Sequence, residues 1–298
     1  MMKYSVVLFF LLITLFTSSC EKDIQITPSS QSVQLVVDAQ IENNSPPVVI
    51  LSTSLNYFST IDSTTLYNSF INNAKVFLSD GTKTIQLKNY EFKFANGYRY
   101  NFYSTDLSDP THTILGVLGK TYQLTIDYNG ALYNSETTIP LLTKQIDSLW
   151  YRPVPNRPLT DSFVVLSAKI TDPPGLGNYI RFYTKINAKD FFPGFNSVFD
   201  DNVVDGKSYA VDLPKGIDKN NIEKGENNSF YKKGDTITVK FCNINKASYE
   251  FWRTWEYAYQ SIGNPFSSPG VVIGNINNGA LGAFCGYAAQ YKKIIIPK

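Results

Sequence analysis

The segment YQLTIDYNGALY, residues 122–133, decides the fold class of this chain. Apolar and polar side chains alternate along Tyr122–Tyr128, which is the two-residue period of a half-buried strand. Asn129-Gly130 follows, and Ala131-Leu132-Tyr133 resumes the strand pattern. Because asparagine and glycine accept the positive φ of tight hairpin turns, the segment predicts two antiparallel strands joined by a two-residue turn.

Similar signals extend toward the amino terminus. Residues 34–41 (QLVVDAQI) are rich in β-branched side chains, and Asp80-Gly81 marks a second hairpin between Ala74–Ser79 and Thr84–Leu87. Short strands separated by turn signals at regular spacing are typical of an antiparallel sandwich. We therefore predict an immunoglobulin-like β-sandwich over residues 33–140.

A second series of strands follows a proline-rich break. Residues 141–160 contain three closely spaced prolines, and we interpret them as a linker or strand crossover. Strand patterns resume at Phe163–Ile170, Asn178–Ile186 and Thr236–Cys242. These patterns predict a second antiparallel β-barrel or β-sandwich domain over residues 161–298.

One main helix interrupts this second series, at about residues 246–262. Asn245 or Ser248 can cap its start, and Gly263 ends it. Its apolar side chains recur with helical period and form a wide stripe, consisting of Phe251, Trp252, Trp255, Ala258, Tyr259 and Ile262. The predicted fold is therefore mostly β, with one helix that covers an open face or end of the second sheet.

The amino terminus has the pattern of an export signal. Lys3 precedes the apolar run Val6–Phe16, and small residues then lead into Cys20. The run is too short to span a bilayer, which takes roughly 20 apolar residues. We predict that residues 1–19 are a lipoprotein signal peptide, that Cys20 becomes the lipidated amino terminus, and that residues 20–32 are a tether. An ordinary cleaved secretory signal with a chance cysteine is the alternative.

Composition excludes one class of partner. The chain has 27 basic and 25 acidic residues, so the loss of residues 1–19, which contain only Lys3, leaves 26 against 25. A nucleic-acid binder normally shows a strong basic excess, so no nucleic-acid partner is expected. Only 17% of the residues are charged, while 20 tyrosines and 20 phenylalanines are present, so surfaces and loops must be built from Asn, Ser, Thr and Tyr.

No catalytic constellation is visible. A hydrolytic triad needs a base, and the only histidine, His112, lies at the edge of a loop after Asp109-Pro110. A glycosidase needs only two carboxylates, which composition does not exclude. We predict no catalytic residues and no enzymatic activity, with a hydrolase as the alternative.

No cofactor or metal site is predicted either. Cys242, Cys285 and His112 are too few for a four-ligand zinc site. The acidic segment from Asp200 to Asp205 offers hard oxygen ligands for calcium, but its spacing does not match an EF-hand loop. A solvated turn is the favoured reading of this segment.

The two cysteines of the mature body, Cys242 and Cys285, leave two alternatives open. An exported protein lies in a compartment that permits a disulfide, so the pair can form a bridge. Alternatively, both are small buried apolar side chains in adjacent strands.

An aromatic segment surrounds the turn at Pro193-Gly194. Its phenylalanines are candidates for contact with a ligand or partner, because aromatic side chains stack on sugars and fill pockets: Phe191, Phe192, Phe195 and Phe199. The alternative is that they plug the end of the sandwich or a domain interface.

A series of short motifs, in this order, resembles one bacterial family. The motifs are Cys20-Glu21-Lys22-Asp23, Leu35–Ala39, Pro46–Leu51, Ser79-Asp80-Gly81, Asp172-Pro173-Pro174-Gly175 with Asn178-Tyr179, Ser197–Asp201, Gly234-Asp235-Thr236, Phe251-Trp252 and Gly263–Pro269. Together they resemble the Bacteroidota outer-membrane lipoprotein family catalogued as domain of unknown function 4249. The resemblance implies an all-β lipoprotein, often encoded beside TonB-dependent receptors, and supplies no catalytic residues.

These observations lead to one leading expectation for function. We expect a lipid-anchored accessory or binding protein of the outer membrane that cooperates with a TonB-dependent transporter in nutrient capture. Lys22-Asp23 resembles a short surface-export signal, so we expect the protein to face the cell surface, with the periplasmic face as the alternative. The competing hypotheses are a lipid-anchored hydrolase on glycan or peptide, and a structural or adhesive surface module.

Overall fold

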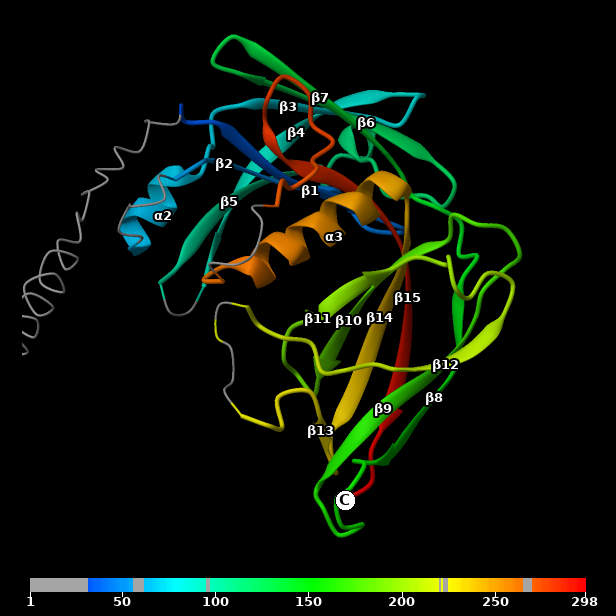
Figure 1. The fold of residues 1–298 in the computed structure, drawn as a ribbon. Helices are drawn as coiled ribbons and strands as arrows, with labels where there is room; N and C mark the ends of the chain where they lie inside the picture. Colours follow the sequence, from blue (N-terminus) through cyan, green and yellow to red (C-terminus); the bar gives the residue numbers. More distant parts are fainter. Residues whose placement is uncertain (1–31, 56–61, 95–96, 220, 222–224, 265–269) are drawn as a thin grey trace, which may run out of the picture. The chain divides into compact units, whose positions relative to one another are not determined.

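Strands dominate the computed structural model, which describes residues 32–55, 62–94, 97–219, 221, 225–264 and 270–298 (Figure 1). The prediction of a mostly β chain is confirmed. The predicted signal peptide, Cys20 and nearly all of the tether lie outside the described residues. Among the residues described, no helix has the length and apolar character needed to cross a membrane.

The larger sheet has eleven strands in the described part of the chain. Their spatial order is β11 (Phe192–Phe199), β10 (Tyr179–Ile186), β14 (Thr236–Ile244), β15 (Leu281–Ile295), β1 (Leu35–Glu42), β2 (Val48–Thr53), β5 (Arg99–Ser104), β4 (Thr84–Lys93), β3 (Lys75–Ser79), β6 (Thr121–Tyr128) and β7 (Ala131–Thr138). The predicted hairpin is present, because β6 pairs with β7 and both Asn129 and Gly130 have positive φ angles.

This sheet folds over at β4. Residues Thr84–Leu87 of β4 pair with β3, whereas Lys88–Lys93 pair with β5. The first hydrophobic core lies between the two layers made in this way and includes Leu51, Leu124 and Phe284. The arrangement is that of a β-sandwich, as predicted for this part of the chain.

A smaller sheet covers the other end. Strand β9 (Phe163–Thr171) pairs with β8 (Gln145–Pro153) on one side and with β12 (Ser208–Asp212) and β13 (Tyr231–Lys232) on the other. The second core lies between this sheet and β10 and β14, and includes Leu166, Phe182 and Phe241. The sheets do not close, so the predicted choice between barrel and sandwich resolves to a sandwich.

The last strand, β15, joins the two halves of the chain. Its first part pairs in parallel with β1, from Val36 opposite Leu281 to Glu42 opposite Tyr287. Its second part pairs with β14 in the antiparallel direction as far as Ile295. Residues 33–298 accordingly form one compact unit, and the predicted linker, residues 141–160, contains β8.

Gly282 makes the parallel junction possible. Its φ is +98°, a conformation that residues with side chains rarely adopt. A Cβ atom at this position would lie 1.9 Å from the carbonyl oxygen of Val37. Only glycine therefore lets β15 approach β1 closely enough to pair.

Helix α3 (Lys246–Ser261) occupies the predicted position, and the Asn245 side chain caps it by accepting a hydrogen bond from the Ser248 N–H at 2.9 Å. It packs on β15, β10 and β11 and covers the third core, which includes Phe251 and Tyr287 (Figure 1). A shorter helix, α2 (Ser63–Ser69), and a 3-10 turn, η1 (Pro110–His112), had no predicted counterpart.

Candidate functional site

The four candidate phenylalanines of the β11 region do not gather at one place. Phe191 packs edge-on against Tyr291, with 5.8 Å between ring centroids. Phe199 stacks on Phe182 at 6.1 Å, and Phe195 points to solvent with 43% of its surface exposed. The structure brings only Phe192 into the cavity described next.

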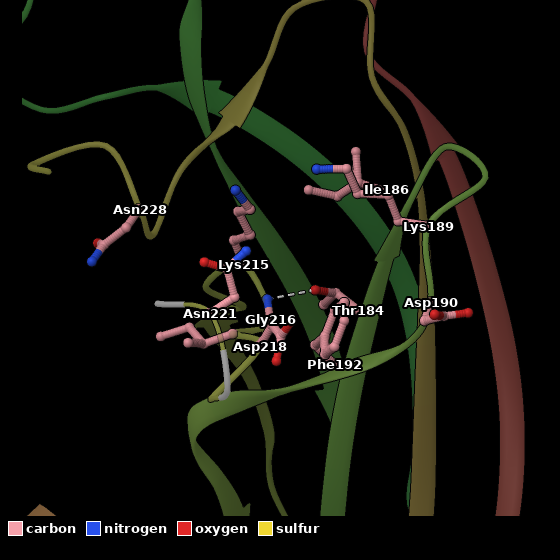
Figure 2. Close-up of a pocket in the computed structure, with 11 residues that line it drawn as sticks. Thr184, Ile186, Lys189, Asp190, Phe192, Lys215, Gly216, Asp218, Asn221 and Asn228 are labelled. Atoms are coloured by element: carbon pink, nitrogen blue, oxygen red, sulfur yellow. Dashed lines mark hydrogen bonds between the residues drawn. The ribbon is translucent and has the colours of Figure 1, made fainter. Parts of the chain in front are cut away.

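A cavity of about 300 Å³ lies between β10, the start of β11 and residues 215–218 (Figure 2). The Gly216 N–H donates a hydrogen bond of 2.7 Å to Thr184 Oγ1, which fastens this segment to β10. A Cβ atom on Gly216 would lie 2.1 Å from the Phe192 carbonyl oxygen, so glycine is required for the segment to lie against β11. The backbone thus fixes one wall of the cavity.

The lining of this cavity is mixed in polarity. Its apolar part consists of Ile186, Phe192 and Ile217. Charged and amide side chains surround this part, namely Lys189, Asp190, Lys215, Asp218, Asn221 and Asn228. An apolar floor with several hydrogen-bonding groups is the usual chemistry of a site for a small ligand.

A second cavity, of about 410 Å³, adjoins the first and shares Ile186, Lys189, Lys215 and Asn228 with it. We call the two together the Phe192 cleft. Its residues come from three segments that are far apart in the sequence. Only the aromatic segment at Phe191-Phe192 gave a signal of this site, and the structure places Phe192 and the predicted turn at Pro193-Gly194 in strand β11. The other lining residues are scattered strand and loop residues without a motif of their own.

A second feature, not found from the sequence, lies on β4 and β5. The side chains of Tyr90, Phe92, Phe94, Tyr100 and Phe102 form a continuous layer of rings with neighbouring centroids 5.0–5.8 Å apart. We call it the aromatic face. Phe92 and Phe94 expose 46% and 47% of their surfaces.

Strand register explains why these rings point away from the first core. Tyr90 lies opposite Phe102, and Phe92 lies opposite Tyr100. The alternate residues Asn101 and Tyr103 are buried. Because successive side chains of a strand point to opposite faces, the rings share the face that the first core does not use.

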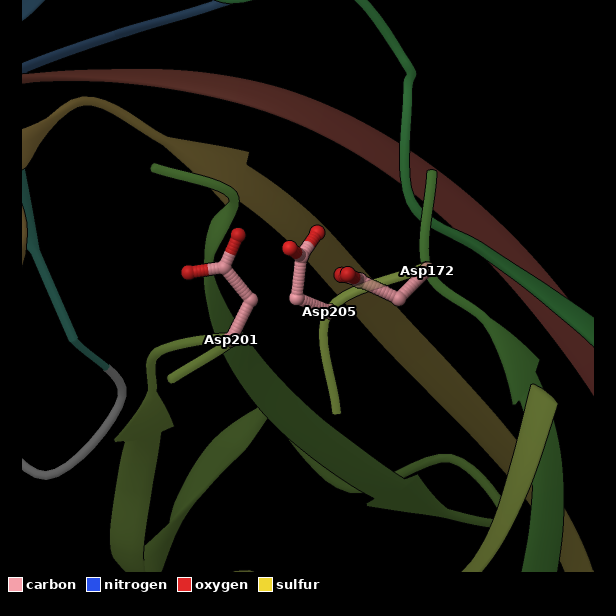
Figure 3. A group of neighbouring side chains, drawn as sticks. All are labelled: Asp172, Asp201 and Asp205. Atoms are coloured by element: carbon pink, nitrogen blue, oxygen red, sulfur yellow. The ribbon is translucent and has the colours of Figure 1, made fainter. Parts of the chain in front are cut away.

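Three carboxylates meet beside the smaller sheet: Asp172, Asp201 and Asp205 have oxygen atoms within 4.8 Å of one another (Figure 3). Each accepts hydrogen bonds from backbone N–H groups of the adjoining loops, namely those of Gly206, Gly177, Asn178 and Gly175. Lys144 Nζ also lies 2.8 Å from Asp172 Oδ1, and both side chains are fully buried.

These three carboxylates hold the loop after β9 and the loop after β11 together through hydrogen bonds, and we call them the clamp. Burial would raise the pKa of Asp201, but hydrogen bonds from Asn178 and Gly177 outweigh it and lower that pKa. Asp201 is therefore held charged by N–H donors, and Lys144 pairs with Asp172 from within the chain. Asp201 and Asp205 belong to the acidic segment considered for calcium, whereas Asp200 instead accepts a hydrogen bond from Tyr249.

The match to a known family is extensive. The family described as a domain of unknown function (DUF4249) matches residues 21–293, nearly the whole chain. The chain belongs to this family. No curated protein matches this chain.

One motif of the DUF4249 resemblance has a clear structural role. Asp172-Pro173-Pro174-Gly175 and Asn178 supply one carboxylate of the clamp and two of the backbone donors that close it. The motif therefore holds the loop after β9 against the loop after β11. Its role in the described structure is architectural.

His112 is exposed in η1, and its Nδ1 lies 2.7 Å from Asp109 Oδ2. Hydrogen bonds from Thr111 and His112 lower the pKa of Asp109 to about 2. This local pair stabilises the turn.

Cys242 and Cys285 are both buried and free. Cys242 lies opposite Ala289, so Cys285 is four residues out of register on the neighbouring strand. That offset is about 13 Å along a strand, whereas bridged Cα atoms lie within about 7 Å. The described structure thus contains the second alternative, two small buried side chains, and burial raises the pKa of Cys242 to about 12.

Proposed function

We propose that the protein is a lipid-anchored accessory of the outer membrane that captures a small nutrient and cooperates with a TonB-dependent transporter. The sequence pattern that ends at Cys20 supports the anchor, and the family resemblance supports the transporter. An anchored body stays close to any partner in the same membrane, so it needs no large interface to remain associated.

The aromatic face is the observation that carries this proposal. Monomeric proteins rarely leave a large contiguous apolar surface open, and such a surface marks a site of contact with a protein, a membrane or a ligand. Five rings lie together on one sheet face, and two of them are nearly half exposed. We assign this face to contact with the transporter and the Phe192 cleft to the nutrient.

Copurification tests the partner. The full-length chain, tagged after Lys298, is isolated from membranes in mild detergent, with and without the double change Phe92→Ser and Phe94→Ser. We expect a β-barrel receptor to copurify with the unchanged chain and to be lost from the double variant. Tyr151→Ser is the matched control, because Tyr151 is 39% exposed on β8, which belongs to the smaller sheet.

Recovery of the monomer alone from the unchanged chain would remove the main support for this proposal. Deletion of the gene should impair uptake of one nutrient, and Cys20→Ala should prevent acylation as measured by mass spectrometry of the mature protein. Turnover of a glycan or peptide by the purified chain would favour the hydrolase alternative instead.

A further inference from the structure

A third cavity, of about 320 Å³, opens between the two sheets of the carboxyl-terminal half. It shares no residue with the Phe192 cleft. Both sites use the same face of β10, since Ile180 and Phe182 line this cavity whereas Thr184 and Ile186 line the cleft. We call it the Phe199 cavity.

The Phe199 cavity reaches from solvent into the second core. Its inner wall consists of buried side chains, among them Ile170, Leu213 and Phe241. Its outer part includes Phe199 and Val203, which are 41% and 83% exposed. The space is therefore open at one end and apolar in its depth.

Polar side chains are few, and two of them are paired with each other at the outer end. Tyr249 OH donates a hydrogen bond of 3.0 Å to Asp200 Oδ2. Asp200 Oδ2 also accepts one of 2.8 Å from Asn202 Nδ2. Among the described residues that line the cavity, Asp200 is the only charged one, and it lies with Phe199 in the outer part.

Water is a poor occupant of the apolar depth of this cavity. A buried water needs two to four polar partners, and an apolar cavity of about 150 Å³ stays dry and binds benzene. The Phe199 cavity has about twice that volume. An alkyl chain or a small ring system would restore the van der Waals contacts that its apolar walls otherwise lack.

We propose that the Phe199 cavity binds a small molecule with an alkyl or aryl body and an uncharged or cationic polar end. The apolar body occupies the depth beside Phe182, and the polar end stays at the mouth beside Asp200. A carboxylate end is disfavoured there, because it would meet the Asp200 charge. This site is separate from the nutrient cleft and does not depend on the transporter.

The test uses the protein that begins at Glu21, because residues 33–298 form one compact unit that contains all three cores. Decanol, decylamine and decanoate compete at pH 7 with the fluorescent probe N-phenyl-1-naphthylamine. We expect one saturable site that decanol and decylamine occupy about tenfold more tightly than decanoate. No saturable displacement, or equal affinity for all three compounds, would overturn the proposal.

Two kinds of variant localise the binding. Val204→Trp and the milder Val211→Phe narrow the cavity and should lower decanol affinity at least about tenfold, while Asn228→Trp in the Phe192 cleft should leave it unchanged. Asp200→Asn changes only the mouth and should remove the preference for decylamine over decanoate. Melting temperatures show that each variant is folded. Wild-type binding by folded Val204→Trp and Val211→Phe would place the ligand elsewhere.

Discussion

At the scale of single residues, the Lys144–Asp172 pair stands apart from the other ion pairs of the described chain. Both side chains are completely buried, whereas Arg152 and Asp212 form a pair that is largely exposed. A buried pair contributes little net stability, because the cost of desolvation offsets the attraction. Removal of one partner is strongly destabilising, since it leaves an unpaired charge in the interior.

Asp172→Asn should therefore lower the free energy of unfolding by roughly 3–5 kcal/mol, since the Lys144 ammonium would remain buried without its counter-ion. The matched change Arg152→Gln, at an exposed pair, should cost less than about 1 kcal/mol. Urea unfolding followed by circular dichroism measures both values. Equal effects of the two substitutions would contradict a structural role of the buried pair.

The sequence revealed only part of this pair. Asp172 stood in a motif with proline and glycine, which indicated a turn correctly. Nothing in the residues around Lys144 indicates burial, because lysine is almost never fully buried without a partner. The partner lies 28 positions later in the chain, and only the packing of the loops brings the two charges together.

At the scale of elements, the turn of the β3–β4 hairpin combines local hydrogen bonds with one contact to a distant part of the chain. Asp80 accepts hydrogen bonds from the backbone N–H groups of Thr82 and Lys83, and Gly81 adopts the positive φ that the turn requires. Lys120 Nζ reaches Asp80 Oδ2 at 2.8 Å from another part of the chain. Burial alone would raise the pKa of Asp80, but these hydrogen bonds hold it well below its usual range.

This pKa predicts how stability depends on pH. Because the folded state lowers the pKa of Asp80 relative to the unfolded chain, its contribution is complete above about pH 4 and is lost as the pH falls further. Asp80→Asn should lower the free energy of unfolding at pH 7. The difference from the unchanged chain should shrink when urea unfolding is repeated at pH 3. A difference that stays constant with pH would show that the charge is not responsible.

Hairpins and helices with a strong local sequence pattern were predicted correctly. Which face of a strand is buried was not predicted. The hairpins at Asp80-Gly81 and Asn129-Gly130 and helix α3 all have turn or capping residues of their own. The alternation along β5, in contrast, fits burial of either face. Pairing with β2 and β4 buries Tyr103 and leaves Tyr100 and Phe102 on the open side of the sheet. The aromatic face therefore depends on strand pairing, which the local sequence pattern does not determine.

At the scale of the whole molecule, β15 connects strands from both ends of the sequence. Residues 281–295 alternate poorly and contain glycine and alanine, so periodicity does not reveal most of this strand. The partner strand β1 lies more than 240 positions earlier. Sequence periodicity carries no information about such a long-range pairing. The predicted domain boundary at residues 141–160 was based on the proline-rich break alone.

Gly282→Ala tests this junction. The new Cβ atom would meet the Val37 carbonyl oxygen at 1.9 Å, so β15 must move away from β1, and we expect a loss of at least about 3 kcal/mol in the free energy of unfolding. Gly279→Ala is the control. It also has a positive φ, but open space surrounds it, so about 1 kcal/mol is expected. Thermal or urea unfolding of both variants measures the difference.

The pairing of β1 with β15 also has a consequence for the order of events during synthesis. Strand β1 lacks this neighbour until residues 281–287 have been made. A chain arrested before Leu281 leaves one flank of β1 bare, and its amino-terminal sheet is unfinished. Completion of this sheet must therefore wait for residues 281–287, however early its first hairpins form.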